Sequence, residues 1–279
     1  IWHLLTHTSG MTYSFHYAHP VDAMYRSAGF DLGKTPDLDL AGCVDAWARL
    51  PLLFEPGSSW NYSVATDVVG RLVELISGQS LDEFFDERIL GPLGMTDTSW
   101  WVPEDKADRL AALYTPDFRT GKAHRGNRAS AEALSPPRAL MGGGGLMSTA
   151  ADYMRFCEML RGRGELGGTR ILGPRTVDYM TVNHLPGNLD MADFGTPINA
   201  EAPPVGMGFG LGFGVVIDPA ASKVLSSRGE YSWGGAASTG FFIDPREDLV
   251  GVFMTQLLPS GIYPLRSQMR QLVNQAIVD

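Results

Sequence analysis

The period of the hydrophobic pattern changes once along this 279-residue chain, near residue 205. Before this point, apolar residues recur every three or four positions, which is typical of amphipathic helices. After it, short runs rich in Val, Ile, Phe and Gly are separated by turn residues, which is typical of strands. Helices followed by an antiparallel sheet predict an α+β fold rather than alternating strand–helix–strand units.

The helical part carries recognisable start and stop signals. Residues 1–10 have the pattern of a helix end, stopped by Ser9 and Gly10. The turn at 56–59 precedes a helix that is predicted to end at Gly78, and a second helical pattern starts at Leu81 and stops at Gly91-Pro92. Further helices are predicted at 41–50, after a cap at Ser148 or Thr149, and over 171–185. A loop with short helical pieces is expected at 11–40, and strand fragments with loops at 103–141.

The last part of the chain is predicted to form the sheet. Strands are expected over 208–217, 223–229, 236–244 and 249–256. The turn at 244–248 joins the last two of these as a hairpin. Residues 262–278 close the chain as an amphipathic helix, with an inward face predicted to hold Leu265, Met269, Leu272, Val273 and Ala276.

Composition excludes several classes of function. The chain is 44% hydrophobic, enough for a sizeable core, and its formal net charge is −9. Such a surface repels nucleic acid and anionic membranes, so neither is expected as a partner. Only Cys43 and Cys157 occur, so no disulfide framework is predicted, and Cys157 is expected to be a buried small apolar residue. No run is long and apolar enough to span a bilayer.

Common catalytic and cofactor signatures are missing from the sequence. There is no G-x-S-x-G elbow and no phosphate-binding P-loop. The four glycines at 142–145 therefore suggest a mobile loop near a cleft, or turn punctuation. His3 and His7 have the spacing of a zinc protease, but Leu4 stands where Glu is needed, so no metal or cofactor is predicted.

Three strings stand out in order along the chain. They are the segments 4–10 (LLTHTSG), 56–64 (PGSSWNYSV) and 231–237 (YSWGGAA). The segments 144–152 and 208–212 fall between them. Together they resemble the serine β-lactamase-related hydrolases, which include class C β-lactamases, DD-peptidases and family VIII esterases. The resemblance implies the penicillin-recognising fold, with an antiparallel sheet flanked by helices and a mostly helical region.

The resemblance also implies the roles of several residues. The family's tyrosine motif matches Tyr62-Ser63-Val64, so Tyr62 is expected to move a proton. Its Lys-Thr-Gly-like strand matches Trp233-Gly234-Gly235, and the following residue, Ala236, would donate its backbone N–H to an oxyanion. Gly234 and Gly235 would let the backbone approach an acyl group. The alternative for Tyr62 is a purely structural role, in which it caps the start of the helix and packs its ring.

The family's first element, Ser-x-x-Lys, has no match. The four lysines are preceded three positions earlier by Asp31, Pro103, Arg119 and Ala220. In the family this motif comes before the LLTHTSG string, and Ile1 stands in the middle of a helix-like pattern. We therefore expect an N-terminal truncation that removes the nucleophile, and a given chain that is itself inactive.

Two departures from the lactam-hydrolysing members indicate the substrate. Trp233 stands where they carry a carboxylate-binding Lys, and Val64 stands where they carry an Asn. Both changes leave an apolar wall, which favours a neutral ester. The prediction is a carboxylesterase that acts on small or short-acyl esters through an acyl-enzyme. The alternatives are a β-lactamase or DD-peptidase, and a non-catalytic relative that only binds its ligand.

The same resemblance predicts the organisation of the chain. One hydrolase domain is expected, with a mostly helical part at 1–205 that carries Tyr62 and a sheet part at 206–279. The final strand, about 249–256, should lack a partner on one side, and Tyr62 should lie near the 233–236 strand. His7 is expected to be a structural hydrogen-bonding residue. Oligomeric state and compartment stay open.

Overall fold

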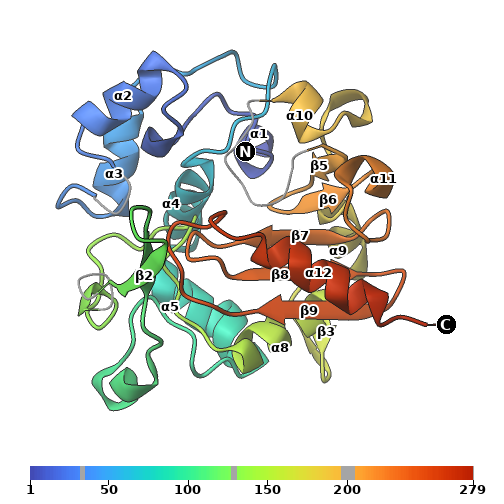
Figure 1. The fold of residues 1–279 in the computed structure, drawn as a ribbon. Helices are drawn as coiled ribbons and strands as arrows, with labels where there is room; N and C mark the ends of the chain where they lie inside the picture. Colours follow the sequence, from blue (N-terminus) through green and yellow to red (C-terminus); the bar gives the residue numbers. More distant parts are fainter. Residues whose placement is uncertain (32–34, 127–130, 196–204, 279) are drawn as a thin grey trace.

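A five-stranded antiparallel sheet forms the centre of the computed structural model, which describes residues 1–31, 35–126, 131–195 and 205–278 (Figure 1). Its strands neighbour one another in chain order. They are β5 (Met207–Phe209), β6 (Gly214–Val216), β7 (Tyr231–Gly234), β8 (Gly240–Asp244) and β9 (Leu249–Phe253). The predicted α+β layout, helices first and an antiparallel sheet after, is confirmed.

One face of the sheet is apolar and large. Tyr231 pairs with Ile243 and Trp233 with Phe241, so these four side chains share a face. Helix α8 (Ala150–Arg161) packs on this face and contributes Cys157, Met159 and Leu160 to the main core. The side chain of Thr149 accepts the Asp152 N–H and caps the helix, as predicted.

The opposite face carries Ser232, Gly234, Gly240 and Gly251 together with Phe242, and α12 (Leu265–Gln275) lies across it (Figure 1). A Cβ at Gly234 would come within 2.4 Å of the Arg266 guanidinium carbon. A Cβ at Gly251 would lie 2.2 Å from the ring of Phe242. Glycine on this face therefore leaves the space that the side chains of α12 and Phe242 occupy.

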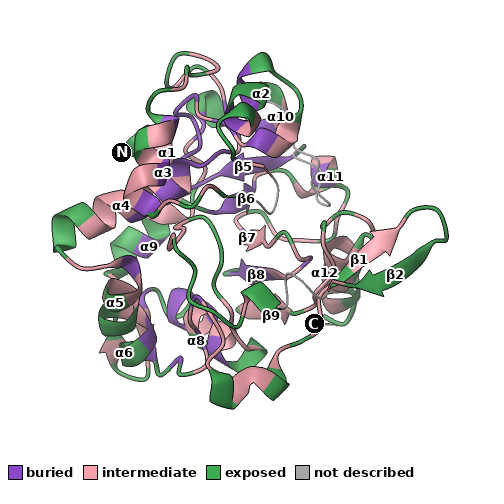
Figure 2. Cartoon of the chain, turned by 90° about the vertical axis from the view of Figure 1, so that its left-hand side faces the viewer, coloured by how far each residue is buried: buried purple, intermediate pink, exposed green. Residues whose placement is uncertain are grey.

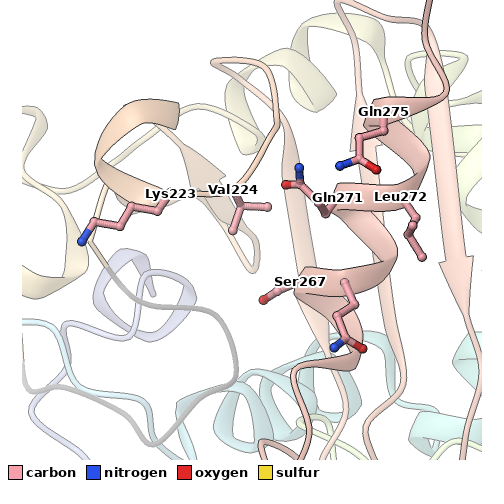
Figure 3. A pocket seen from close by; sticks show the side chains of 7 residues that line it. Lys223, Val224, Ser267, Gln271, Leu272 and Gln275 are labelled. Atoms are coloured by element: carbon pink, nitrogen blue, oxygen red, sulfur yellow. The ribbon is translucent and has the colours of Figure 1, made fainter.

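The predicted inward face of the terminal helix is partly wrong. Leu265, Met269 and Val273 are half-buried, but Leu272 is 67% exposed and Ala276 is also exposed. Arg266 and Arg270 are four positions apart, so they lie on the same side of α12, and this side faces the sheet. Leu272 therefore points outward. Leu272 lines a shallow groove of about 510 Å³ together with Lys223, Val224, Ser267, Gln268, Gln271 and Gln275 (Figure 3).

Two buried carboxyl groups lie near the end of α12, and Arg270 forms an ion pair with one of them, Glu230. Glu230 precedes β7 and Asp244 ends β8, and both are fully buried. The Arg270 Nη2 atom lies 3.0 Å from Glu230 Oε1, although the pair is not aligned as a hydrogen bond. Burial raises the pKa of Glu230 to about 7, and Asp244 adds to this rise while Arg270 opposes it.

This cluster predicts a pH dependence of stability. Because the folded state favours neutral Glu230, its contribution is fully present below about pH 4.5 and is lost as pH rises through about 7. We expect Glu230→Gln to flatten this fall by ~2–3 kcal/mol of unfolding free energy. Urea unfolding of both proteins at pH 5 and pH 8 measures the effect. An equal pH dependence in the variant would contradict it.

The helical part agrees with most of the predicted boundaries. Its helices are α1 (Trp2–Leu5), α2 (Pro20–Ser27), α3 (Leu40–Trp47), α4 (Ala65–Ser77), α5 (Leu81–Phe85) and α6 (Gly91–Leu93). Helix α4 ends at Gly78, which has a φ of 73°, as predicted. The next pattern does not stop at Gly91-Pro92. It continues to Gly94, because Pro92 lies in the first turn of α6, where no N–H is required.

The remaining elements are short. They are α9 (Pro174–Met180), α10 (Met191–Phe194), α11 (Pro219–Ser222), the hairpin β1 (Tyr114–Asp117) and β2 (Lys122–Arg125), and the hairpin β3 (Glu165–Leu166) and β4 (Thr169–Arg170). Strand β2 is exposed along its length, whereas buried residues concentrate in β5, β6 and β8 (Figure 2). Among the described helices, none combines the length and apolar character needed to cross a membrane.

Three of the predicted strands differ from the structure. The segment 208–217 is two strands, because the chain turns at Gly212, which has a φ of 94°. The segment 223–229 is not a strand, since Lys223 adopts a left-handed conformation directly after α11. The segment 236–244 becomes a strand only at Gly240, after a turn. The hairpin turn between β8 and β9 is confirmed.

Strand β9 forms an edge of the sheet. It pairs with β8 from Leu249 to Phe253, and within the described residues no strand lies on its other side. This agrees with the predicted unpaired edge.

Cys43 and Cys157 are both free and buried. The division of the domain near residue 205 stays a prediction, and Lys34, at which a Ser-x-x-Lys motif was sought, lies outside the described residues.

Candidate active site

The backbone around Tyr62 is held firmly in front of α4. The Asn61 N–H donates to His7 O at 2.9 Å, and the Asn61 amide donates to Met11 O at 3.0 Å. On the other side, His16 Nε2 lies 2.6 Å from Tyr62 O. The backbone at Asn61 and Tyr62 is therefore held by hydrogen bonds to His7, in the LLTHTSG string, and to Met11 and His16, which follow this string.

The ring of Tyr62 lies where the helical part meets the sheet. Its centroid is 5.4 Å from that of Trp233 on β7 and 5.0 Å from those of Tyr13 and His7. The structure thus brings together two of the strings that are 171 positions apart in sequence. This agrees with the expected proximity of Tyr62 and the 233–236 strand.

The surroundings of Tyr62 favour its neutral form. Burial raises the pKa of Tyr62, and the charge of Asp67 adds to the rise. Hydrogen bonds with the Trp233 and Tyr13 side chains and the charge of Arg266 act in the opposite direction. A phenol in this setting can donate a proton at neutral pH, but it needs a further nearby cation to serve as a base.

Behind β7, Arg266 supports the turn that holds the predicted oxyanion donor. The Gly235 N–H donates to Thr239 O at 3.0 Å and closes the turn. From α12, Arg266 Nε donates to Thr239 O at 2.8 Å, and its Nη2 donates to Gly235 O. Ala236 is exposed at this turn, and no described residue accepts a hydrogen bond from its N–H. Sequence reasoning missed Arg266, although it follows the first apolar residue of the predicted terminal helix.

The two glycines of this strand have local structural roles. The space beside Gly234 holds the Arg266 guanidinium, and a Cβ at Gly235 would lie 2.4 Å from Thr239 Oγ1. A side chain at either position would displace Arg266 or Thr239, whether or not an acyl group approaches the strand.

Val64 lies apart from this group. It is 4% exposed and packs in a second core cluster with Val21, Tyr25 and Cys43. The side chain therefore belongs to the interior between α2, α3 and α4. Its proposed place in the wall of an acyl site gains no support from this position.

His7 and Ser63 form a pair that resembles a catalytic dyad only superficially. His7 Nδ1 lies 3.2 Å from Ser63 Oγ, and its Nε2 lies 3.4 Å from Thr66 Oγ1. Both residues are buried, and Ser63 Oγ accepts the Ala65 N–H at 3.3 Å. Burial lowers the pKa of His7 to about 3, and His16 adds to this effect. The pair therefore forms a buried hydrogen-bonded contact at the start of α4, and His7 is the structural residue that was predicted.

The first two residues of the glycine tetrad, Gly142 and Gly143, pack on α4, whereas a Cβ at Gly144 would meet nothing within 4 Å. A Cβ at Gly142 would lie 2.5 Å from Thr66 O, and one at Gly70 would lie 3.2 Å from Gly142 Cα. Next to them, the Gly143 N–H donates to Asp67 Oδ1 at 2.8 Å. The sequence does not indicate that the backbones of Gly70 and Gly142 approach each other closely.

Tyr13 and Asp67 are further site residues that sequence reasoning missed. The Tyr13 hydroxyl donates to Asp67 Oδ2 at 3.4 Å, and its ring packs beside that of Tyr62. Asp67 lies five positions after Tyr62, in the first turn of α4. The sequence signal that could have identified Asp67 is an acidic residue on the predicted buried side of an amphipathic helix. Within the described residues, no group of three His, Cys, Asp or Glu side chains could hold a metal ion.

Comparison with known proteins shows what the whole chain is similar to. The family model described as Beta-lactamase matches residues 1–273. Protein Rv1367c of Mycobacterium tuberculosis is 40% identical over 260 residues, covering 92% of this chain and 62% of the relative. Esterase EstB of Burkholderia gladioli is 32% identical over 291 residues, covering 98% of this chain and 69% of the relative.

A solved structure agrees with the fold. It is titled EstCE1, a hydrolase with promiscuous acyltransferase activity, and it superposes with a TM-score of 0.80 at 28% identity. The alignment covers 98% of this chain and 71% of that chain. The mycobacterial relative is the longer protein, since this chain spans 62% of its length.

Proposed function

The chain belongs to the β-lactamase family, and we propose that it forms most of the active site of a serine carboxylesterase. Its homologues include an esterase and a hydrolase with acyltransferase activity. The observation that carries the proposal is the meeting of Tyr62 with Trp233 at a ring distance of 5.4 Å. In this arrangement, Tyr62 is the proton-transfer residue and the turn after β7 supplies an oxyanion donor.

The nucleophile of the proposed enzyme comes from outside these 279 residues. No Ser-x-x-Lys occurs in the sequence. The unpaired side of β9 and the exposed Leu272 on α12 are surfaces on which a further strand and helix could pack. We call this chain together with a segment that carries Ser-x-x-Lys the extended protein.

The proposed reaction proceeds through an acyl-enzyme. The serine oxygen attacks the ester carbonyl carbon, and its proton passes to the Lys–Tyr62 pair. The Ala236 N–H stabilises the oxyanion, and Tyr62 protonates the leaving alkoxide as the ester bond breaks. Water then attacks the acyl carbon, gives a proton to the same pair and releases the acid, and the serine regains its proton.

The proposed substrate is a neutral ester with a small acyl group. Trp233 presents an indole beside Tyr62 and Phe209, with ring distances of 5.4 and 5.3 Å. A neutral aromatic side chain attracts apolar groups and offers no charge to a substrate carboxylate. Since Val64 lies in the core, this argument rests on Trp233 alone.

A charge introduced at this wall should change the substrate preference. In the extended protein, we expect Trp233→Lys to raise kcat/KM for nitrocefin relative to a p-nitrophenyl butyrate ester, because the ammonium can attract the lactam's carboxylate. Trp233→Leu is the matched control, since it removes the indole without adding charge. The ratio of the two kcat/KM values is the measurement. If Lys and Leu change this ratio equally, Trp233 does not face the acyl site.

The same assay separates the alternatives. A β-lactamase or DD-peptidase would hydrolyse nitrocefin or a D-Ala-D-Ala peptide faster than any neutral ester before mutation. A non-catalytic binding protein would turn over neither class. Because a similar solved structure is titled as a hydrolase with acyltransferase activity, addition of a simple alcohol also tests for acyl transfer through formation of a new ester.

We also propose that the chain is one hydrolase domain, with parts at 1–205 and 206–279. The support is that the site draws Tyr62 from the first part and Trp233 from the second. A small ester is the proposed partner, and neither nucleic acid nor a membrane is required by this arrangement.

A further inference from the structure

Asp67 is a buried acid close to the proposed active site. It lies in the first turn of α4 and is 4% exposed. Its two oxygens have different partners, since Oδ1 accepts the Gly143 N–H at 2.8 Å and Oδ2 accepts the Tyr13 hydroxyl at 3.4 Å. Among the described residues, no Lys or Arg forms an ion pair with it. Burying an ionised carboxyl without a cation costs free energy, which hydrogen bonds and protonation reduce.

Tyr13 stands between this acid and Tyr62. Its hydroxyl donates to Asp67 Oδ2, and the neighbouring Tyr62 side chain contributes to the raised pKa of the Tyr13 phenol. The rings of Tyr13 and Tyr62 are 5.0 Å apart, and the ring of Tyr13 stacks on Phe15 at 4.8 Å. A phenol has one proton, so Tyr13 can donate to Asp67 or to the Tyr62 oxygen, but not to both at a time.

We propose that Asp67, acting through Tyr13, is a positioning residue that sets the direction of the hydrogen bonds at the Tyr62 hydroxyl and thereby its readiness to lose a proton. The inference deepens the proposed function, because it concerns the same Tyr62. It gives Tyr13, in segment 11–15, and Asp67, in the first turn of α4, a role in controlling the Tyr62 hydroxyl. Neither residue belongs to the Tyr motif or to the glycine-rich strand.

The two charge states of Asp67 give two arrangements. When Asp67 is ionised, it accepts the Tyr13 proton, so the Tyr13 oxygen can only accept a hydrogen bond from neutral Tyr62. When Asp67 is protonated, its carboxyl O–H can donate a hydrogen bond to the Tyr13 oxygen. The Tyr13 hydroxyl can then rotate and donate its own hydrogen bond to the Tyr62 oxygen. The second arrangement holds one proton more than the first and stabilises a Tyr62 phenolate, so loss of the Tyr62 proton restores the net charge of the first arrangement.

The acid is held in a rigid position. A Cβ at Gly143 would lie 3.0 Å from Tyr13 Oη and 3.1 and 3.2 Å from the two Asp67 oxygens. Glycine at this position therefore lets the backbone close over the carboxyl and the phenol together. The contact explains why the glycine tetrad meets α4 at this turn.

The charge of Asp67 changes within an accessible pH range. Burial raises the pKa of Asp67 to about 6, and the Gly143 N–H and the Tyr13 hydroxyl oppose the rise. The other titratable or charged groups that face the network are His7 and His16 beside the rings, Cys43 near Asp67, and Arg266 near Tyr62. His7 stays neutral above its lowered pKa of about 3, so His16 is the group that must be controlled for.

The test can use the 279-residue chain itself. With 3-fluorotyrosine in place of tyrosine, each ring gives a fluorine NMR signal, and Tyr62→Phe and Tyr13→Phe identify the two of interest. We expect the Tyr62 signal to shift as Asp67 titrates, near pH 6. This shift should persist in His16→Gln and disappear in Asp67→Asn and in Tyr13→Phe.

The phenol titration of Tyr62 gives a second readout. Asp67→Asn removes the charge and can donate to the Tyr13 oxygen, so the Tyr62 midpoint should move to lower pH. Asp152→Asn is the matched control, because Asp152 is also a buried first-turn acid that accepts a backbone N–H, from Asp97 at 2.7 Å, and a hydroxyl, from Thr98 at 2.9 Å. It should leave the Tyr62 midpoint unchanged.

The outcomes separate this inference from the proposed function. If the Tyr62 signal of the wild-type chain does not respond near pH 6, the inference is overturned, even if Asp67→Asn does not fold. In the extended protein, the pH profile of kcat should shift to lower pH in Asp67→Asn. If the coupling is present in NMR but the extended protein hydrolyses no ester, the proposed function is wrong and the network is structural.

Discussion

Replacing Tyr62 by Phe in the extended protein should lower kcat by ~10²–10⁴-fold and change KM little, because the variant keeps the ring but loses the group that transfers the proton. The ring contacts with Trp233, Tyr13 and His7 are made by the aromatic carbons and can persist in Phe. A loss of this size is therefore expected without a change of fold.

The control for this experiment is another partly buried tyrosine. Tyr153 on α8 packs against Phe241 in the main core, away from the Tyr62 group. Tyr153→Phe should retain near-normal kcat. Steady-state kinetics with p-nitrophenyl butyrate, together with circular dichroism of each variant, measure both effects. If Tyr62→Phe turns over as fast as Tyr153→Phe, Tyr62 is a packing residue at the start of α4.

Local signals in the sequence were enough for much of the fold. Helix α4 follows a turn and ends at Gly78, and α8 starts after the Thr149 cap, as the side-chain chemistry predicts. The hairpin between β8 and β9 likewise follows from its turn residues. These features depend on neighbours a few positions apart, which a sequence shows directly.

Errors arose where distant segments decide the local structure. The segment 223–229 has strand-like composition, but the turn at Lys223 after α11 takes it out of the sheet. The orientation of α12 depends on Arg266 and Arg270 reaching the sheet from one stripe, which a count of apolar residues cannot reveal. Such outcomes come from tertiary contacts that override local propensity.

The candidate site shows the same limit. Tyr62 and Trp233 were found because they stand in strings that resemble a family. Their ring contact then follows from the fold. Tyr13, Asp67 and Arg266 act through hydrogen bonds that join segments 54, 76 and 31 positions apart, and no motif marks them. Val64 was assigned to the site from its place in the motif, yet its side chain packs in the core.

The second large effect concerns the nucleophile. The chain as given should hydrolyse no ester, because its site residues include a proton-transfer phenol and an oxyanion donor but no activated serine. Ser63 directly follows Tyr62, but it is buried, hydrogen-bonded to neutral His7, and its Oγ accepts the Ala65 N–H. The extended protein should acquire turnover through the serine of its Ser-x-x-Lys motif.

Fluorophosphonate labelling of the 279-residue chain and of the extended protein, followed by peptide mapping, identifies the serine that acts as the nucleophile. The proposal predicts no specific labelling of the chain and stoichiometric labelling of one serine in the extended protein, at the Ser-x-x-Lys motif. Ser→Ala at that motif should abolish the label. Stoichiometric, saturable labelling of Ser9 or Ser63 in the chain alone would contradict the account.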